Sequence, residues 1–248
     1  VLVLTQGGYV KRTNPSEYKV QKRGGVGVID LNTKEEDVVT KLLTTSAHSD
    51  LLFFTNKGKV YQSKMYEIPE GRRATKGKSI MNFLSLTSDE KVTSVIALRK
   101  EEKDSDWSLM MVTEQGVAKK VDGASFKDVR RSGLIAIGLK DDDSLIAAQF
   151  VSKGDEVSLV SAQGQSIRFE ESDIRQMGRT AAGVRGMKLA KGDAIVSAEV
   201  LEKGGKDREI LVIMENGYGK TTPGKEYKTQ KRGGSGIKTA KVTAKTGN

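Results

Sequence analysis

The chain has 248 residues, of which 36% are hydrophobic and 30% charged, so its composition is globular and not that of a disordered protein. Its apolar runs are far too short to cross a bilayer, and the lack of cysteine excludes disulfides and thiolate metal sites. Lysine and arginine number 42 against 32 acidic residues, which gives a net charge of +10. Such an excess favours a polyanionic partner.

An apolar run followed by a glycine turn occurs five times along the chain. The first two are VLVLTQGG and LLFFTNKG, and the turn glycines are Gly8, Gly58, Gly116, Gly164 and Gly217. A second glycine follows each of them after 17 or 19 residues, at Gly27, Gly77, Gly133, Gly183 and Gly236. This regularity indicates an array of five repeats. We place the repeats at about 1–50, 51–107, 108–156, 157–209 and 210–248 and expect them to form a single domain.

Each repeat has the pattern of four short strands. The opening run of Val, Leu and Ile is too short for a helix and suits a strand buried on both faces. The turn glycine supplies the positive φ of a tight hairpin, and a more polar strand returns. A further β-rich run and a closing apolar strand follow, the latter within 35–45 in the first repeat. Four strands every fifty residues predict an all-β, propeller-like fold of four-stranded blades.

The fifth repeat reaches Asn248 before a closing strand. We therefore expect the sequence to be a piece of a longer protein. The charged stretches 99–107 and 202–209 are predicted to link neighbouring repeats as solvated segments.

The loop around each second glycine carries cations. We call these segments box loops 1 to 5; they are residues 18–30, 69–80, 128–137, 176–187 and 227–239. Box loops 1 and 5 share the full motif Q-K-R-G-G-x-G, at 21–27 and 230–236. The glycines could serve only a tight corner between strands. A corner alone, however, needs neither adjacent Lys and Arg nor a preceding Gln. Glycines also let a phosphate backbone approach closely, and Lys and Arg neutralise it. A loop of this kind repeated around a ring predicts a basic rim for a long polyanion.

The segment GYVKRTNPSEYKVQKRGGVG (8–27) resembles the signature of the C-terminal domain of the bacterial DNA gyrase A protein. The five-repeat pattern, with pieces such as MGRTAAGVRGMKL, extends this resemblance over essentially the whole chain. The family implies a β-pinwheel, a six-bladed propeller-like ring with strands exchanged between neighbouring blades, of which about five blades are visible here. The family box usually reads Q-R-R-G-G-(K/R)-G. This chain departs from it at Lys22 and Val26, and the fifth repeat has Ser235 in the place of Val26.

The resemblance implies a non-catalytic domain that binds double-stranded DNA and wraps it around its rim with a defined hand. The wrapped segment is presented for strand passage and negative supercoiling. The implied partners are the N-terminal cleavage domain of the same polypeptide, which holds the catalytic tyrosine, and the gyrase ATPase, in an A2B2 assembly. We expect a cytoplasmic, nucleoid-associated protein whose isolated domain is monomeric and uses no cofactor, metal or membrane.

The predicted DNA-binding residues are the members of the box loops. We expect Lys22, Arg23, Lys231 and Arg232 to matter most. The full set is Gln21, Lys22, Arg23, Gly24, Gly25, Gly27, Arg72, Arg73, Lys76, Lys78, Arg130, Arg131, Arg179, Arg185, Gln230, Lys231, Arg232, Gly233, Gly234 and Gly236.

Other functions fit the sequence less well. The C-terminal domain of the topoisomerase IV A protein shares the repeat but commonly has a degraded first box. A protein-interaction propeller predicts aromatic or apolar loop tips, whereas the tips here are Lys, Arg and Gly. A protein that binds single strands or RNA usually has exposed aromatic side chains that stack on bases, whereas only 5% of residues here are aromatic. The single histidine, His48, lies in a polar turn and is not expected to be catalytic. The acidic turn 140–144 lacks the spacing of a calcium loop and is expected to be a solvated turn.

Overall fold

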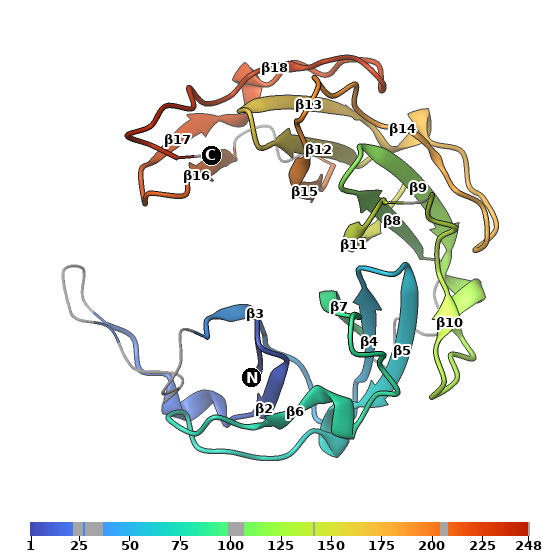
Figure 1. Ribbon diagram of the computed structural model, residues 1–248, viewed down its shortest axis with the longest axis vertical. Coiled ribbons are helices and arrows are strands. Elements are labelled where there is room, and N and C mark those ends of the chain that lie inside the picture. Colours follow the sequence, from blue (N-terminus) through green and yellow to red (C-terminus); the bar gives the residue numbers. More distant parts are fainter. Residues whose placement is uncertain (22–26, 28–36, 99–106, 141, 204–207, 248) are drawn as a thin grey trace. The chain divides into compact units, whose positions relative to one another are not determined.

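A computed structural model describes residues 1–21, 27, 37–98, 107–140, 142–203 and 208–247 (Figure 1). These residues form β-strands and short 3-10 helices, with no α-helix in the described ranges, which confirms the all-β prediction. No helix in this part of the chain is long and apolar enough to span a membrane. The 3-10 helices are η1 (Pro15–Glu17), η2 (Met65–Glu67), η3 (Ile80–Asn82), η4 (Gly123–Phe126), η5 (Glu171–Asp173) and η7 (Gly224–Glu226).

Within the described ranges, the strands form four four-stranded sheets and one two-stranded sheet. The first sheet has the order β3 (Val39–Leu43), β1 (Leu2–Thr5), β2 (Tyr9–Arg12), β6 (Lys78–Ser79). The second has the order β10 (Leu134–Ile135), β5 (Lys59–Lys64), β4 (Asp50–Thr55), β7 (Val92–Leu98). The third has the order β11 (Leu145–Val151), β8 (Ser108–Thr113), β9 (Val117–Asp122), β14 (Val184–Arg185). The fourth has the order β15 (Ile195–Leu201), β12 (Glu156–Ser161), β13 (Gln165–Glu170), β18 (Ile237–Lys238), and the last sheet pairs β16 (Glu209–Ile213) with β17 (Gly219–Pro223).

One edge strand of each four-stranded sheet comes from the next repeat. β6 pairs with β2, β14 with β9 and β18 with β13, each antiparallel. The β-rich run after each second glycine therefore pairs in the sheet of the preceding repeat. This is the strand exchange that the family resemblance implies. The repeat boundaries drawn from the sequence do not show it, because nothing local distinguishes the two pairings.

The first two strands of each repeat follow directly from the sequence. β4 is buried along its whole length, as the run DLLFFT predicts. The turn glycines have positive φ, and Gly58 N–H donates to the carbonyl of Thr55 at 2.9 Å. The closing strands also form as predicted: β3 lies beside β1, and Leu2 faces Leu43 across the pair.

In the third and fourth repeats, an aspartate of the acidic or glycine turn accepts hydrogen bonds from the neighbouring hairpin. Asp143 Oδ1 accepts from the Gln115 backbone N–H at 3.0 Å, and Asp193 Oδ1 accepts from Gln163 N–H at the same distance. Each of these aspartates also accepts from the next residue's backbone N–H. The turn 140–144 therefore serves the β-sheet, in line with its interpretation as a turn and not a calcium loop.

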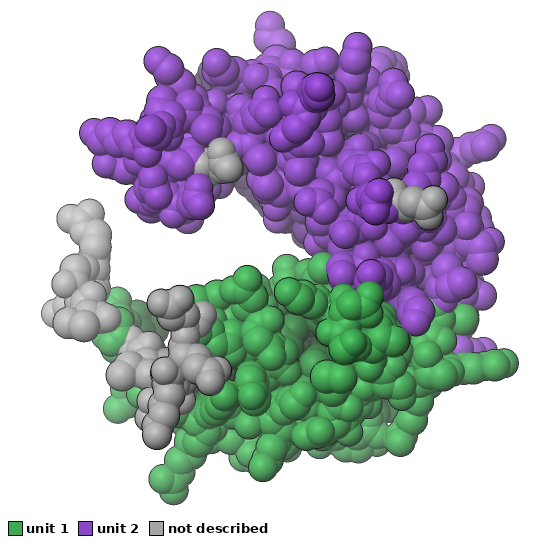
Figure 2. All heavy atoms as spheres, viewed as in Figure 1, with its two compact units in different colours: residues 1–53, 60–105, 129–134 green, residues 54–59, 106–128, 135–248 purple. Residues whose placement is uncertain are grey.

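The chain divides into two compact units, each with its own core (Figure 2). Unit 1 contains residues 1–53, 60–105 and 129–134; unit 2 contains 54–59, 106–128 and 135–248. The core of unit 1 is built from Leu2, Leu4, Val10, Leu51, Phe53, Tyr61, Met65, Ile68, Ile80 and Leu84. The core of unit 2 includes Met110, Val112, Val157, Leu159, Ile167, Phe169, Ile174, Met187 and Ile195. Each core packs the inner residues of successive sheets and carries box loops at its surface.

Candidate nucleic-acid interface

Most of box loop 1 lies outside the described residues. The structure describes Gln21 and Gly27, which are both exposed. Lys22, Arg23, Gly24, Gly25 and Val26 fall in the range that it does not describe, so their predicted roles stay predictions. Gly27 has a φ of +79° and open space where a Cβ would lie.

The second glycines of the other box loops are required by close contacts, with backbone carbonyls at Gly77, Gly183 and Gly236 and with the Tyr61 ring at Gly133. All have positive φ. A Cβ on Gly77 would lie 2.5 Å from the carbonyl oxygen of Val10, and one on Gly236 would lie 2.2 Å from that of Ser166. These glycines begin the exchanged strands, so they let each box loop turn closely onto the preceding sheet. Their role in the described residues is the corner between strands.

Box loop 2, in unit 1, is held by a buried lysine beneath it and by neighbouring side chains at the surface. The Lys11 ammonium donates to the backbone carbonyls of Arg73 and Thr75. Arg73 N–H donates to Glu17 Oε2 at 2.7 Å. The Lys76 ammonium lies 4.0 Å from the centroid of the Tyr9 ring, a cation–π geometry. The loop's backbone is therefore fixed, with Arg72 and Lys78 exposed and Arg73 and Lys76 half-buried.

Box loop 3 contributes two exposed arginines to unit 1. Arg131 pairs with Glu67 at 3.5 Å. Hydrogen bonds from Lys64 and Ser63, together with this neighbouring charge, lower the pKa of Glu67. Arg130 is exposed and has no side-chain partner among the described residues. Tyr61 lies directly beneath Gly133, since a Cβ there would meet its ring at 2.6 Å.

Box loop 4, in unit 2, uses one arginine to hold the backbone and exposes another. Arg179 Nη1 donates to the carbonyl of Ile135 at 2.9 Å. The buried Lys119 donates to the carbonyls of Ala136 and Arg179. Arg185 is exposed, and its guanidinium has no partner within the described ranges.

Box loop 5 carries a full motif whose two cations both have intramolecular partners. Lys231 Nζ lies 3.0 Å from Asp173 Oδ1, and this hydrogen bond and charge raise the pKa of Lys231. Arg232 donates from Nε to the carbonyl of Asp173 at 2.8 Å and from Nη1 to that of Arg185 at 3.0 Å. Arg232 therefore occupies in box loop 5 the place that Arg179 has in box loop 4. Each arginine ties its own box loop to the short strand of the preceding box loop, Arg179 to β10 and Arg232 to β14.

Backbone hydrogen bonds also join box loops 4 and 5. Gly233 N–H donates to the carbonyl of Gly186 at 2.6 Å, and the N–H of Lys188, the residue directly after box loop 4, donates to that of Gly234 at 2.9 Å. The side chain of Arg185 lies beside Gly233, within 4.0 Å of where that residue's Cβ would be. The structure thus brings Arg185 together with the cations and glycines of box loop 5.

Gln230, the first residue of the second full motif, is anchored by its backbone. Its N–H donates to the Arg168 carbonyl at 2.7 Å. This bond ties the start of the motif to β13, the strand that also receives β18.

The predicted cations fall into two groups by their partners. Arg73, Lys76, Arg131, Arg179, Lys231 and Arg232 are engaged with the protein. Four others are exposed and have no side-chain partner in the described part of the chain; they are Arg72, Lys78, Arg130 and Arg185. Box loops 2, 3 and 4 supply this second group, which is free to meet an anion.

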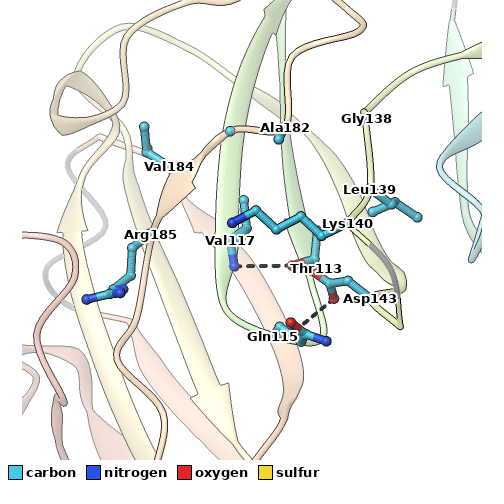
Figure 3. A pocket seen from close by; sticks show the side chains of 11 residues that line it. Thr113, Gln115, Val117, Gly138, Leu139, Lys140, Asp143, Ala182, Val184 and Arg185 are labelled. Atoms are coloured by element: carbon cyan, nitrogen blue, oxygen red, sulfur yellow. Dashed lines mark hydrogen bonds between the residues drawn. The ribbon is translucent and has the colours of Figure 1, made fainter.

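A cavity of about 380 Å³ lies beside box loop 4 (Figure 3). Its lining includes Arg185 and Lys140, an exposed lysine outside the box loops that was not predicted from the sequence. Thr113, Gln115 and Asp143 of the hairpin and the acidic turn line the same cavity (Figure 3). Lys140 adds a further exposed cation to the lining of this cavity on unit 2.

Two buried lysines, Lys11 and Lys119, were likewise not predicted from the sequence; their exposed fractions are 1% and 0%. Alignment of the repeats could have predicted their burial. They occupy the third position after the turn glycine, where the second and fourth repeats have Tyr61 and Ile167, two residues suited to a core.

Burial lowers the pKa of the Lys119 ammonium to about 8, and the nearby positive charge of Arg179 adds to this effect. Between about pH 8 and 10.5 the unfolded chain therefore binds more protons at this residue than the folded chain. The contribution of Lys119 to the free energy of unfolding must rise with pH in that window, by at most about 1.4 kcal/mol per pH unit. We expect urea denaturation at pH 7.5 and 9.5 to show this rise in the wild type relative to Lys119→Met. Equal pH dependence of the two proteins would contradict it.

The described residues contain no cluster of His, Asp and Glu able to hold a metal ion. His48 is exposed and forms an edge contact with the ring of Tyr66, in keeping with a role in its turn.

Comparison with known proteins places these features in a family. The family model described as "DNA gyrase C-terminal domain, beta-propeller" matches residues 1–46, 49–99, 108–152, 155–202 and 208–245. The A subunit of DNA gyrase from Staphylococcus epidermidis strain ATCC 12228 is 44% identical over 248 residues, which is all of this chain and 28% of the relative. The same protein from Staphylococcus aureus strain NCTC 8325 is 43% identical over the same coverage. The chain thus spans a little over a quarter of these relatives' length.

Two solved structures are similar over 99% of this chain. The C-terminal domain of DNA gyrase A has a TM-score of 0.83 at 29% identity, with 79% of that chain covered. The C-terminal domain of DNA topoisomerase IV has a TM-score of 0.78 at 28% identity, with 74% covered. The matches to gyrase A proteins over the full chain favour gyrase over topoisomerase IV. The chain belongs to the DNA gyrase C-terminal domain family.

Proposed function

We propose that this chain binds duplex DNA by its phosphate backbone along the box loops and wraps it with a defined hand. The observation that carries the proposal is that three successive box loops of a gyrase C-terminal domain present exposed, unpartnered cations among the described residues, at Arg72, Lys78, Arg130 and Arg185. Arg and Lys on a fixed backbone are suited to phosphate contacts. The chain has no long helix in its described residues to read a groove, so we expect little base specificity.

At the level of the whole protein, we propose that the chain is the DNA-wrapping part of an ATP-dependent type IIA topoisomerase. The cleavage domain with the catalytic tyrosine would precede it in the same polypeptide, and the gyrase ATPase would complete an A2B2 assembly. The proposed place of action is the nucleoid in the bacterial cytoplasm. The support for these statements is the length and identity of the gyrase A relatives.

A ligation assay tests the wrapping. Nicked circular plasmid is incubated with rising amounts of the chain, ligated and deproteinised, and its linking number is read on a gel. We expect a progressive positive shift, because wrapping of one hand is fixed at ligation. Binding in a mobility-shift assay without a change in linking number would contradict wrapping. No binding at low salt would overturn the proposal and favour a protein-interaction propeller.

The salt dependence of DNA binding should identify the contacting cations. Replacing Arg72, Lys78, Arg130 and Arg185 together by Gln is expected to reduce the slope of log affinity against log salt by about 0.9 per lost phosphate contact, and so by about 3 to 4. The control replaces the exposed Lys153 and Lys191, which lie outside the box loops, by Gln. Titration by fluorescence anisotropy at several salt concentrations measures both slopes. A slope that matches wild type in the quadruple variant would show that DNA follows another path.

A further inference from the structure

One register position lies beneath each described box loop. It is the third residue after the turn glycine, on the strand that receives the exchanged strand of the next repeat. The occupants in the first four repeats are Lys11, Tyr61, Lys119 and Ile167. All four are buried, with exposed fractions of 0 or 1%. The floor of a box loop is thus a core position, and two repeats fill it with a lysine.

Both lysines donate to backbone carbonyls of box loops: Lys11 to two carbonyls of box loop 2, and Lys119 to one carbonyl of box loop 3 and one of box loop 4. Lys119 Nζ donates to the carbonyl of Ala136 at 2.9 Å and to the carbonyl of Arg179. Lys11 Nζ donates to the carbonyl of Thr75 at 3.0 Å and to that of Arg73. In both cases one accepting carbonyl belongs to an arginine of the box loop.

The register position beneath box loops 3 and 5 holds no lysine, although box loop 3 receives the bond from Lys119 to Ala136. The Tyr61 hydroxyl donates away from box loop 3, to Glu90 Oε2 at 2.9 Å. The Ile167 side chain lies under Gly234, 3.5 Å from where its Cβ would be. Box loop 5 is fixed instead by the backbone donors of Gln230 and Gly233. The lysines occur beneath box loops 2 and 4, which lack the full Q-K-R-G-G-x-G motif; box loop 3 also lacks it and has Tyr61 at this position.

A buried ammonium has strong directional requirements. It must replace its lost hydration with acceptors, and no carboxylate in the described residues forms a salt bridge with Lys119. Backbone carbonyls of box loops 3 and 4 meet this need, so the lysine holds both loops by hydrogen bonds. The same positive charge repels the guanidinium of Arg179, whose Nη1 is bound instead to the carbonyl of Ile135.

We propose that Lys11 and Lys119 are positioning residues that fasten box loops 2 and 4 from below, so that the exposed cations of these loops stand in place to meet DNA phosphates. The proposal rests on the proposed function, since it assigns these lysines to the DNA-binding loops. They do not touch the DNA themselves. Lys11 acts through the carbonyls of Arg73 and Thr75 in box loop 2, and Lys119 joins the carbonyl of Arg179 in box loop 4 to that of Ala136 in box loop 3.

The primary test replaces Lys119 by Met, which keeps the length of the side chain and removes its donors. Amide hydrogen exchange of the free protein should accelerate about tenfold or more in box loop 4 and remain unchanged in β12 and β13. Affinity for a linear duplex should fall several-fold more than in Lys153→Met, a control that removes one exposed positive charge. Unchanged exchange in box loop 4 of a folded Lys119→Met protein would overturn the proposal.

A second variant and a measurement on the wild type keep the test decisive if Lys119→Met does not fold. Lys119→Ile copies the residue that the fourth repeat has at this register and should behave in the same way. In the wild type, the Lys119 ammonium should give a ¹⁵N-detected NMR signal protected from exchange with water, and its absence would contradict the proposal.

The positioning role and the proposed function can fail separately. Accelerated exchange in box loop 4 of Lys119→Met, in a protein whose wild type binds no DNA, would support the fastening of the loop and overturn the proposed function. DNA binding by the wild type, with unaltered exchange in box loop 4 of Lys119→Met, would support the proposed function and overturn the fastening of the loop.

Discussion

Replacing Lys22 and Arg23 together by Ala is expected to abolish the shift in plasmid linking number while leaving much of the binding to linear duplex intact. Box loop 1 carries the full motif, and removing two phosphate contacts should lower the salt slope of binding by only about 2. Wrapping is more sensitive than binding, because bending a 20–30 bp segment by 40–90° costs about 1–6 kcal/mol. That deformation must be offset by contacts along the whole path. The ligation assay and mobility shift measure the two properties on the same samples.

The control for this prediction removes the same number of positive charges outside the box loops. Lys153→Ala with Lys191→Ala removes two exposed cations outside the box loops and should leave the linking-number shift in place. The control variant should unfold at the same temperature as wild type, since Lys153 and Lys191 lie on the surface. We expect the same unfolding temperature for Lys22→Ala with Arg23→Ala, so that any loss of wrapping reflects DNA contacts. A Lys22→Ala, Arg23→Ala protein that still wraps DNA would show that this motif is not the main anchor.

Gly236→Ala should strongly destabilise the fold, by about 3 kcal/mol. Its φ of +75° is unfavourable for an L-residue, which costs about 1–2 kcal/mol. The new Cβ would also lie 2.2 Å from the Ser166 carbonyl oxygen and 2.6 Å from its carbon. Both atoms are backbone, and Ser166 pairs with Ile237 in the fourth sheet, so the clash is relieved only by disturbing that pairing. Urea denaturation would measure the loss of free energy of unfolding.

Gly217→Ala separates the two causes. Gly217 has a φ of +79°, almost that of Gly236, but has open space where the Cβ would be placed. We expect this variant to lose only about 1–2 kcal/mol, the conformational part alone. Equal losses in the two alanine variants would mean that the approach of box loop 5 to β13 is not enforced by packing.

The two classes of prediction concern different residues of the same motif. The cations are expected to act on DNA with little effect on stability, whereas the second glycine acts on stability through strand pairing. In box loop 5 this division is less sharp, because Lys231 pairs with Asp173 and Arg232 donates to two carbonyls. Any contact of Arg232 with a phosphate would have to use the remaining donors of its guanidinium.

The repeat, the opening hairpins, the closing strands and the positions of the glycines could all be predicted without the structure. These features are local: an apolar run, a glycine with positive φ and a polar return strand lie within about twenty residues of each other. β4 and the turn at Gly58 illustrate this, since both follow from DLLFFTNKG. The family resemblance also predicted strand exchange, which the pairing of β6 with β2 confirms.

Which cations are free and which are engaged became visible only in the folded chain. Arg179 and Arg185 look alike in the sequence, but Arg179 binds the Ile135 carbonyl and Arg185 has no partner among the described residues. The burial of Lys119 likewise depends on a loop sixty residues later in the chain. Such contacts join residues that are distant along the chain, and the sequence around a charged side chain does not indicate which carbonyl it will bind. Repeat period and backbone conformation are set by neighbours in sequence, whereas the partners of long cations are set by neighbours in space.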